Sequence, residues 1–202
     1  NHIADNGAAA MASTLELNFT IAALDLSSNC IRSRGTIALA NACQSTSSLV
    51  RLNLGSNRIG TSAMNAIANV IRLQSSLERL DLFSCFDSTN DIAVLIDALR
   101  DNRVLRAIDL RQNPLPPTLP DLLELMLSEN HTVQELLLDE WTDQQFSILH
   151  DALNKNRIRN NRLLIHRLFK SRISIEQLKK IRIDQYAEIA DTIAAMAGLM
   201  KS

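Results

Sequence analysis

Aliphatic residues return along this chain at a constant interval of 28 residues. The central column of the pattern consists of Leu24, Leu52, Leu80, Ile108 and Leu136. A second column follows two residues later and a third stands three residues earlier: Leu26, Leu54, Leu82, Leu110 and Leu138, then Ile21, Leu49, Leu77, Leu105 and Val133. A unit of this length holds one strand, one turn and one helix, which is too little to bury its own leucines. The sequence therefore predicts a stack of like units that share one core.

A polar column after the leucines predicts how the chain turns. Five residues beyond the central column stand Asn29, Asn57, Cys85, Asn113 and Trp141, which gives the motif L-x-x-L-x-L-x-x-N/C in four copies and a degenerate fifth. The L-x-L alternation predicts a short strand with its leucines on one side. An Asn side chain at the turn can pair with backbone groups of neighbouring units, and a Cys can partly replace it as a weak donor.

Each predicted strand is followed by a stretch with the apolar period of a helix. These stretches are residues 36–43, 62–71, 91–99, 120–127 and 143–153. Strand-turn-helix units stacked in parallel predict an α/β solenoid, with a parallel β-sheet on the concave face and α-helices on the convex face.

The motif and its spacing resemble the ribonuclease-inhibitor-like class of leucine-rich repeats over about residues 1–160. Residues 86–88 and 114–117 depart from the usual strand-to-helix loops of that class. The resemblance implies a module that binds proteins. Hosts of such arrays include innate-immune sensors, enzyme inhibitors, tropomodulin-like actin caps and fixed parts of the cilium and flagellum. A short array with a helical end suits the last two hosts.

The period also predicts the domain organisation. At a shift of 28 residues, the start of the chain aligns with a later repeat: Asn1, His2, Ile3 and Gly7 match Asn29, Cys30, Ile31 and Gly35. Residues 1–20 are therefore expected to form a half repeat, and the chain is expected to be a fragment of a longer protein or a subunit of a larger assembly. Five repeats then start near residues 21, 49, 77, 105 and 133. Beyond residue 160 the period fails, and residues 161–202 are expected to form a terminal strand and an amphipathic C-terminal capping helix. The alternative is a helix that docks on a partner.

The sequence does not contain the residue patterns typical of membrane spans, metal sites or catalytic centres. No apolar run approaches the roughly 18–20 residues of a membrane span. The three cysteines have no CxxC spacing, and the four histidines fall at different repeat positions. No phosphate-binding loop or nucleophile motif occurs. We therefore expect an intracellular, cytoplasmic protein that is not an enzyme, with no cofactor, no metal, no membrane contact and no small-molecule ligand.

The outward positions of the stacked strands predict a binding surface. Stacking at about 4.8 Å per strand would place arginines, aspartates and one aromatic residue in a single patch on the concave face. Arginine and aromatic residues are enriched at protein-binding hot spots. The alternative is that neighbouring arginines and aspartates only pair with one another. The predicted patch consists of Arg51, Arg79, Asp81, Phe83, Arg106, Asp109 and Arg111.

Charge is segregated towards the end of the chain. Residues 112–154 carry acidic side chains and no Lys or Arg, whereas residues 155–182 are strongly basic. The basic segment either covers the acidic repeats or contacts an acidic partner such as tubulin tails. Few stacking aromatics and no known motif argue against nucleic acid. The predicted contacts with an acidic partner are Arg157, Arg159, Arg162, Arg167, Lys170 and Arg172.

Together these features predict a non-catalytic protein-interaction scaffold, used as a structural part of a cytoskeletal, ciliary or flagellar assembly. Two alternatives remain. One is regulation of a small GTPase, since Ran GTPase-activating proteins carry similar repeats, although the strongly acidic tail expected of them is absent. The other is inhibition of an enzyme. Both come from likeness of fold rather than from a site.

Overall fold

The computed structural model describes residues 2–46, 48–73, 76–139 and 149–160. The chain divides into two compact units, residues 1–153 and 154–202. In the first unit, helices and short strands alternate: α1 Ala4–Leu17, β1 Ala23–Asp25, α2 Ser33–Ser45, β2 Arg51–Asn53, α3 Thr61–Arg72, β3 Arg79–Asp81, α4 Thr89–Asp101, β4 Ala107–Asp109, α5 Leu119–Glu129 and β5 Glu135–Leu137. Residues 149–160 are also helical.

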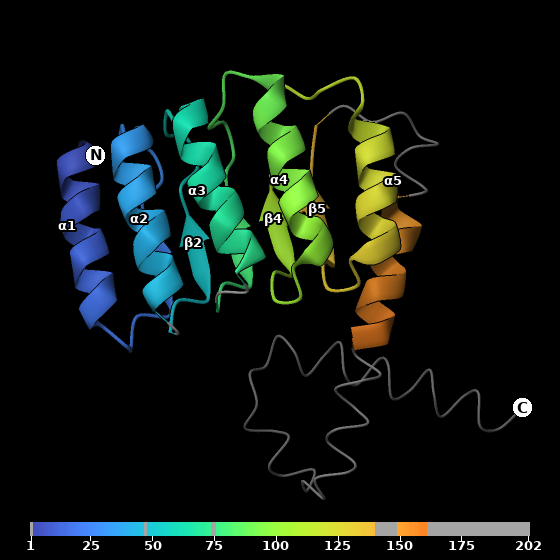
Figure 1. Ribbon diagram of the computed structural model, residues 1–202, viewed down its shortest axis with the longest axis horizontal. Helices are drawn as coiled ribbons and strands as arrows, with labels where there is room; N and C mark the ends of the chain where they lie inside the picture. The colour runs from blue at the N-terminus through green and yellow to red at the C-terminus, as the bar shows by residue number, and fades with distance from the viewer. Residues whose placement is uncertain (1, 47, 74–75, 140–148, 161–202) are drawn as a thin grey trace, which may run out of the picture. The chain divides into compact units, whose positions relative to one another are not determined.

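The five strands form one parallel sheet in chain order, β1-β2-β3-β4-β5. The predicted ladder is confirmed, because Leu24 pairs with Leu52, Leu52 with Leu80, Leu80 with Ile108 and Ile108 with Leu136. Figure 1 shows α1 to α5 side by side in chain order, in one layer against the sheet. The chain is therefore an α/β leucine-rich-repeat solenoid.

The core lies between the sheet and the helices. Most leucines in the strands and directly after them are buried, among them Leu52, Leu54, Leu80 and Leu82, whereas Leu24 and Leu138 are half-buried. They pack against apolar helix residues such as Leu95. Each fully buried leucine contributes about 1.5–3 kcal/mol, so stacking repeats stabilises units that could not fold alone.

The helices extend beyond the predicted stretches because their end turns carry polar residues outside the apolar period. Thus α2 begins at Ser33 and ends at Ser45, whereas the pattern predicted 36–43. The half repeat also contributes a full helix, α1. A side chain at Gly35 would meet the Asp5 carboxylate and the side chains of Ala8 and Ile31 at 2.8–2.9 Å, so glycine there allows α1 to approach α2 closely.

Buried asparagines join successive repeats at the turns after the strands. The Asn57 side chain accepts hydrogen bonds from the backbone N–H groups of Asn29 (3.1 Å) and Ile31 (2.9 Å), and donates to the carbonyls of Leu26 (2.9 Å) and Leu54 (2.7 Å). Each asparagine thus satisfies backbone groups of two repeats.

Asn113 and Cys85 continue this ladder. Asn113 accepts from the backbone N–H groups of Cys85 and Phe86 and donates to the carbonyls of Leu82 and Leu110. Cys85 donates through its thiol to the Leu54 carbonyl at a Sγ–O distance of 3.2 Å. Burial raises the pKa of the Cys85 thiol to about 12, which keeps the donor proton in place at neutral pH.

A second polar column, which the sequence analysis missed, stands at the ends of the helices. Asn18, Thr46, Asn102 and Asn130 are again 28 residues or a multiple of 28 apart. Asn102 accepts from the N–H groups of Val104 and Leu105, and it donates to the Ile71 carbonyl one repeat earlier. Asn130 repeats the arrangement with Thr132, Val133 and the Leu99 carbonyl. Side-chain amides therefore join neighbouring repeats at both edges of the solenoid.

Replacing Asn57 with alanine should strongly destabilise the protein. Two buried N–H groups and two carbonyls would lose a partner, and each unsatisfied group costs about 1–3 kcal/mol, so the expected loss is about 3–5 kcal/mol. Urea unfolding followed by circular dichroism measures it. Asn69→Ala, on the exposed face of α3, is the matched control and should change stability by less than about 0.5 kcal/mol. Equal effects of the two substitutions would contradict the role of the ladder.

Replacing Thr36 with valine should stabilise the protein. Thr36 in α2 is fully buried, and its hydroxyl has no hydrogen-bond partner among the described residues. Valine has the same shape and removes that unsatisfied group, so we expect a gain of about 1 kcal/mol in the free energy of unfolding. Thr14→Val is the control, because the Thr14 hydroxyl is exposed and donates to the Ala10 carbonyl. A loss of stability in Thr36→Val would contradict the prediction.

Candidate protein-binding surface

The outward side chains of the five strands form straight rows across the sheet. Side chains alternate along a strand, so the residues on either side of each buried leucine face outward. Parallel pairing places Ala23, Arg51, Arg79, Ala107 and Glu135 in one row. The next row consists of Asp25, Asn53, Asp81, Asp109 and Leu137. This surface, the concave face, follows directly from the repeat register.

The carboxylates and amide of the second row have a structural task that the sequence analysis missed. In each of Asp25, Asn53, Asp81 and Asp109, the side-chain Oδ1 accepts a hydrogen bond from the backbone N–H two residues later, at N–O distances of 2.9–3.2 Å. This is an Asx turn, which ends the strand and starts the loop. Asp or Asn at 28-residue intervals was the available signal.

Arg79 and Glu135 pair across an intervening strand. The Arg79 Nη1 lies 2.9 Å from the Glu135 Oε2, although β4 separates their strands. Between them in the row stands Ala107, whose methyl group is small enough to let the arginine reach over. Both charged side chains remain a little over 40% exposed, so the pair adds little stability. Its main effect is to hold both side chains in place.

Arg111 joins the carboxylate of Asp109 and the ring of Phe83. The Arg111 Nη2 lies 2.6 Å from the Asp109 Oδ2, and its guanidinium carbon lies 5.9 Å from the centre of the Phe83 ring. That distance is at the outer limit of a cation–π contact. Arg111 is exposed whereas Asp109 is buried. The three side chains form an ordered cluster, with the positive charge turned to solvent.

The electrostatics of the cluster are centred on Asp109. Burial acts to raise the pKa of its carboxyl, but hydrogen bonds from the side chain and backbone of Arg111, together with the charges of Arg111 and Arg79, outweigh burial and hold the pKa below its usual value. Asp109 is therefore ionised at neutral pH.

The structure brings together part of the predicted patch. Arg79, Phe83, Asp109 and Arg111 lie on β3, β4 and the turns that follow them. Arg51 stands beside Arg79 in the first row and makes no ion pair with any described residue, and Asp81 forms an Asx turn. Arg106 lies just before β4, with its Nε 3.6 Å from the Glu78 Oε2. Glu78 and Glu135, which balance Arg106 and Arg79, were not predicted as members. In both pairs the opposite charges stand one or two periods apart in the sequence, but the period alone does not show which side chains reach each other.

Two of the six predicted contacts for an acidic partner fall in the described part of the chain. Arg157 and Arg159 are exposed in the helical segment 149–160. Arg162, Arg167, Lys170 and Arg172 lie outside the described residues, as do Trp141 and the predicted C-terminal helix.

The described residues offer neither a metal-binding cluster nor a membrane-spanning helix. No group of three or more His, Cys, Asp or Glu side chains there is arranged to hold a metal ion. None of the helices in the same part of the chain combines the length and the apolar character needed to cross a membrane.

The charge of Asp109 should make a pH-dependent contribution to stability. Its folded-state pKa is lowered, so the contribution is present above the unfolded value of about 3.9 and is lost as pH falls through the folded value. Asp109→Asn keeps the Asx acceptor, as Asn53 shows, but removes the charge. The variant should unfold at lower urea than wild type at neutral pH and match it once the pH has fallen well below the folded-state pKa, where Asp109 is protonated. A difference that persisted unchanged in acid would show that shape, rather than charge, is responsible.

The chain is similar to one sequence family and to two solved protein structures. The sequence model of the family described as Leucine Rich repeat matches residues 17–40 and 46–68. No curated protein matches the sequence significantly. Among solved structures, the chain is similar to actin-binding site 2 of leiomodin-1, with a TM-score of 0.71, 13% identity, and coverage of 79% of this chain and 95% of that one. It is also similar to the tropomodulin C-terminal domain of Caenorhabditis elegans, with a TM-score of 0.65, 15% identity, and coverage of 77% and 98%.

These likenesses agree with the repeats seen in the chain itself. At such low identity the two structures show a shared fold and nothing of a shared partner. The family match covers the first two repeats, and the same strand register continues through β5. The 28-residue unit is compatible with the ribonuclease-inhibitor-like class. The chain is a leucine-rich-repeat protein.

Proposed function

We propose that this chain is a non-catalytic protein-binding scaffold of the cytoskeleton and that it binds its partner through the concave face. The observation that carries the proposal is the ordered cluster of Phe83, Asp109 and Arg111 on a rigid sheet. Arginine beside an aromatic ring is a composition enriched in binding hot spots.

The concave face is prepared for binding before a partner arrives. Immobilising a long side chain on binding costs about 0.5–1.5 kcal/mol. Arg79 and Arg111 are already held by Glu135 and Asp109, so that cost is smaller for them. Because each arginine remains exposed by more than 40%, a partner carboxylate can approach it without first displacing the internal one. The internal pairs are therefore compatible with binding.

Actin is the partner to test first. The similar domain of leiomodin-1 is named as an actin-binding site, and the repeat array of this chain has the same fold over nearly the full length of that domain. The partner itself is an inference from fold and needs its own evidence. Neither comparison gives support to a tubulin partner or to a place in the cilium. Regulation of a small GTPase and inhibition of an enzyme stay predictions without a supporting observation.

The exposed arginines of the segment 149–160 form a second proposed contact. Arg157 and Arg159 make no ion pair with any described residue, and both side chains are open to solvent. They would meet an acidic surface of the partner. Such a contact weakens as ionic strength rises, because exposed charges are screened by salt.

Co-sedimentation with actin filaments tests the proposal. Wild-type protein should sediment with the filaments, and Arg111→Glu and Phe83→Ala should each weaken binding about tenfold or more, which corresponds to about 1.4 kcal/mol. Arg72→Glu is the matched control, since Arg72 is also paired with a carboxylate but lies at the end of α3, in the helix layer. It should leave binding unchanged.

The outcomes separate the two parts of the proposal. Failure of the folded wild-type chain to bind actin filaments or monomers would reject actin as the partner. Binding that Arg111→Glu and Phe83→Ala leave intact would reject the concave face. The circular dichroism and the urea midpoint of each variant show whether it has kept its fold.

A further inference from the structure

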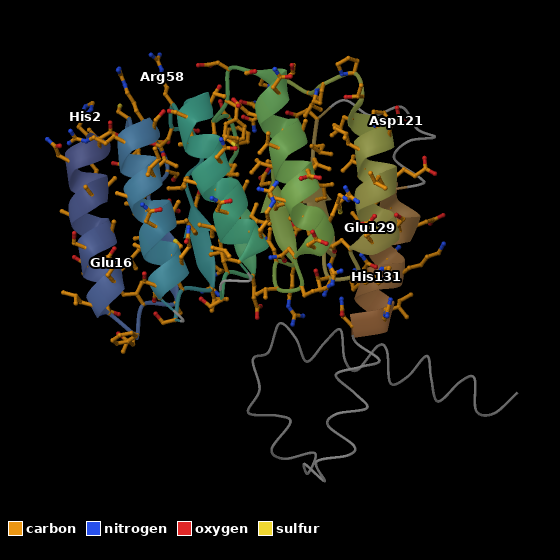
Figure 2. The ribbon with its side chains drawn as sticks, viewed as in Figure 1. His2, Glu16, Arg58, Asp121, Glu129 and His131 are labelled. Atoms are coloured by element: carbon orange, nitrogen blue, oxygen red, sulfur yellow. The ribbon has the colours of Figure 1, made fainter. Side chains whose placement is uncertain are left out.

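Two adjoining hollows lie at the edge of the sheet where the strands run into the helices, in the first repeats of the array. One has a volume of about 470 Å³ and the other about 500 Å³, and they share Cys30 and Arg32. Figure 2 shows Arg58 projecting from this edge, on the same side of the array as His2. We call the two hollows together the loop groove. Its lining is Ala4, Asp5, Asn6, Ser28, Cys30, Arg32, Arg34, Ser56 and Arg58.

The arginines of the loop groove lack the carboxylate partners that five other arginines of the array have. Arg72, Arg79, Arg100, Arg106 and Arg111 each form an ion pair. Among the described residues, by contrast, Arg32 and Arg58 pair with no acidic group, and Arg34 donates to the neutral side-chain amide of Asn6. All three are exposed. The groove therefore presents three positive charges that the repeat array does not neutralise through ion pairs.

Asp5 is the acidic residue in the lining, and it is engaged with backbone. Its Oδ1 accepts hydrogen bonds from the N–H groups of Arg32, at 2.7 Å, and Gly35, at 3.0 Å. It thereby caps the first turn of α2 from the neighbouring repeat. The same bonds occupy backbone donors that a phosphate group would use at a helix start. The ligand must therefore bind through the guanidinium groups, which match carboxylates in a planar, two-bond geometry.

The backbone of the loop groove is held in a fixed shape. Ser28, Cys30 and Ser56 have positive φ angles of 56°, 56° and 55°, a region that non-glycine residues seldom occupy. Hydrogen bonds to the next repeat hold these turns, from the Ser28 N–H to the Gly55 carbonyl at 2.9 Å and from the Ser56 N–H to the Phe83 carbonyl at 2.6 Å. A groove formed in advance loses little entropy when a ligand enters.

From these observations we propose that the loop groove binds an acidic segment of a partner protein, in extended conformation, with its carboxylates paired to Arg32 and Arg58. These arginines lie on the loops of adjacent repeats, and the Arg58 backbone N–H donates to the Ile31 carbonyl at 3.0 Å, so their backbones lie close together. Alternate side chains of an extended peptide are about 7 Å apart, which two long, flexible arginines on neighbouring loops can match. This second surface is separate from the proposed concave-face contact. The absence of aromatic residues in the lining favours a peptide over a nucleic acid.

Cys30 provides a local reporter for the test. It is exposed in the middle of the groove, whereas Cys43 and Cys85 are buried and burial raises the pKa of each thiol to about 12. In the folded protein a neutral alkylating agent such as iodoacetamide should therefore modify Cys30 and spare the other two. The modification rate at Cys30, followed by mass spectrometry, reports occupancy of the loop groove and not of the basic segment further along the chain.

The experiment measures that rate with an oligo-glutamate peptide, an oligo-glutamine peptide of equal length, inorganic phosphate and a single-stranded oligonucleotide. We expect oligo-glutamate to slow the modification of Cys30 about fivefold or more at saturation, an effect that salt weakens. Arg32→Glu combined with Arg58→Glu should abolish the protection. Arg72→Glu combined with Arg106→Glu makes the same charge change outside the groove and should retain it.

Several results would overturn the proposal. These are no protection by oligo-glutamate, equal protection by oligo-glutamine, stronger protection by phosphate or the oligonucleotide, or equal loss in both double variants. If the groove variant fails to fold, its Cys43 and Cys85 will react as well. Arg58→Gln alone then replaces it and should weaken protection by oligo-glutamate. Because Phe83 and Arg111 are unchanged throughout, actin binding and Cys30 protection can fail independently.

Discussion

The pairing of buried backbone groups at the turns is the constraint on which the rest of this structure depends. A strand of three residues supplies few ladder hydrogen bonds, so the chain on either side of it must find partners elsewhere or remain in contact with water. Asn57 and Asn113 solve this on one edge of the sheet, and Asn102 and Asn130 solve it on the other. Each amide reaches a carbonyl of the preceding repeat, so the fold of one repeat depends on its neighbour. That dependence imposes one interval on the whole sequence.

A fixed interval has a direct consequence for the outer surface. Once Leu52, Leu80 and Ile108 are in register, the residues beside them must also line up across the sheet. The concave face is therefore a surface of stacked columns, in which the side chain at one position always meets those one repeat away. In the second row, one side chain has two roles. Asp109 ends its strand by an Asx turn, and it also holds Arg111 near Phe83. Structural need and surface charge cannot be separated at such a position.

The sequence alone was sufficient to predict the features that follow from the 28-residue interval. It was insufficient for contacts that depend on how far a side chain extends between repeats. The sheet order and the leucine ladder follow from the columns, and the role of Cys85 in the asparagine column follows from its chemistry. The pairing of Arg79 with Glu135 does not, because it needs a long side chain to extend past Ala107 to the second strand away. Likewise, periodicity places Asp5 in a half repeat but does not reveal that it caps α2. Both contacts depend on side-chain geometry between repeats, which a pattern of residue types does not contain.

The contrast between paired and unpaired arginines gives the array two different surfaces. On the concave face, Asp109 and Glu135 balance Arg111 and Arg79, so a partner that contacts these two arginines gains mainly from shape, the Phe83 ring and preformed geometry. At the loop groove, Arg32 and Arg58 offer charge that no acidic group among the described residues neutralises, so a partner there gains from electrostatic attraction that also accelerates encounter. Because the two surfaces lie on different repeats of the same array, a partner touching both would be attracted first by the loop groove and then fixed by the concave face. A rigid stack of repeats is compatible with these two roles, because neither surface has to change conformation for a partner to bind the other.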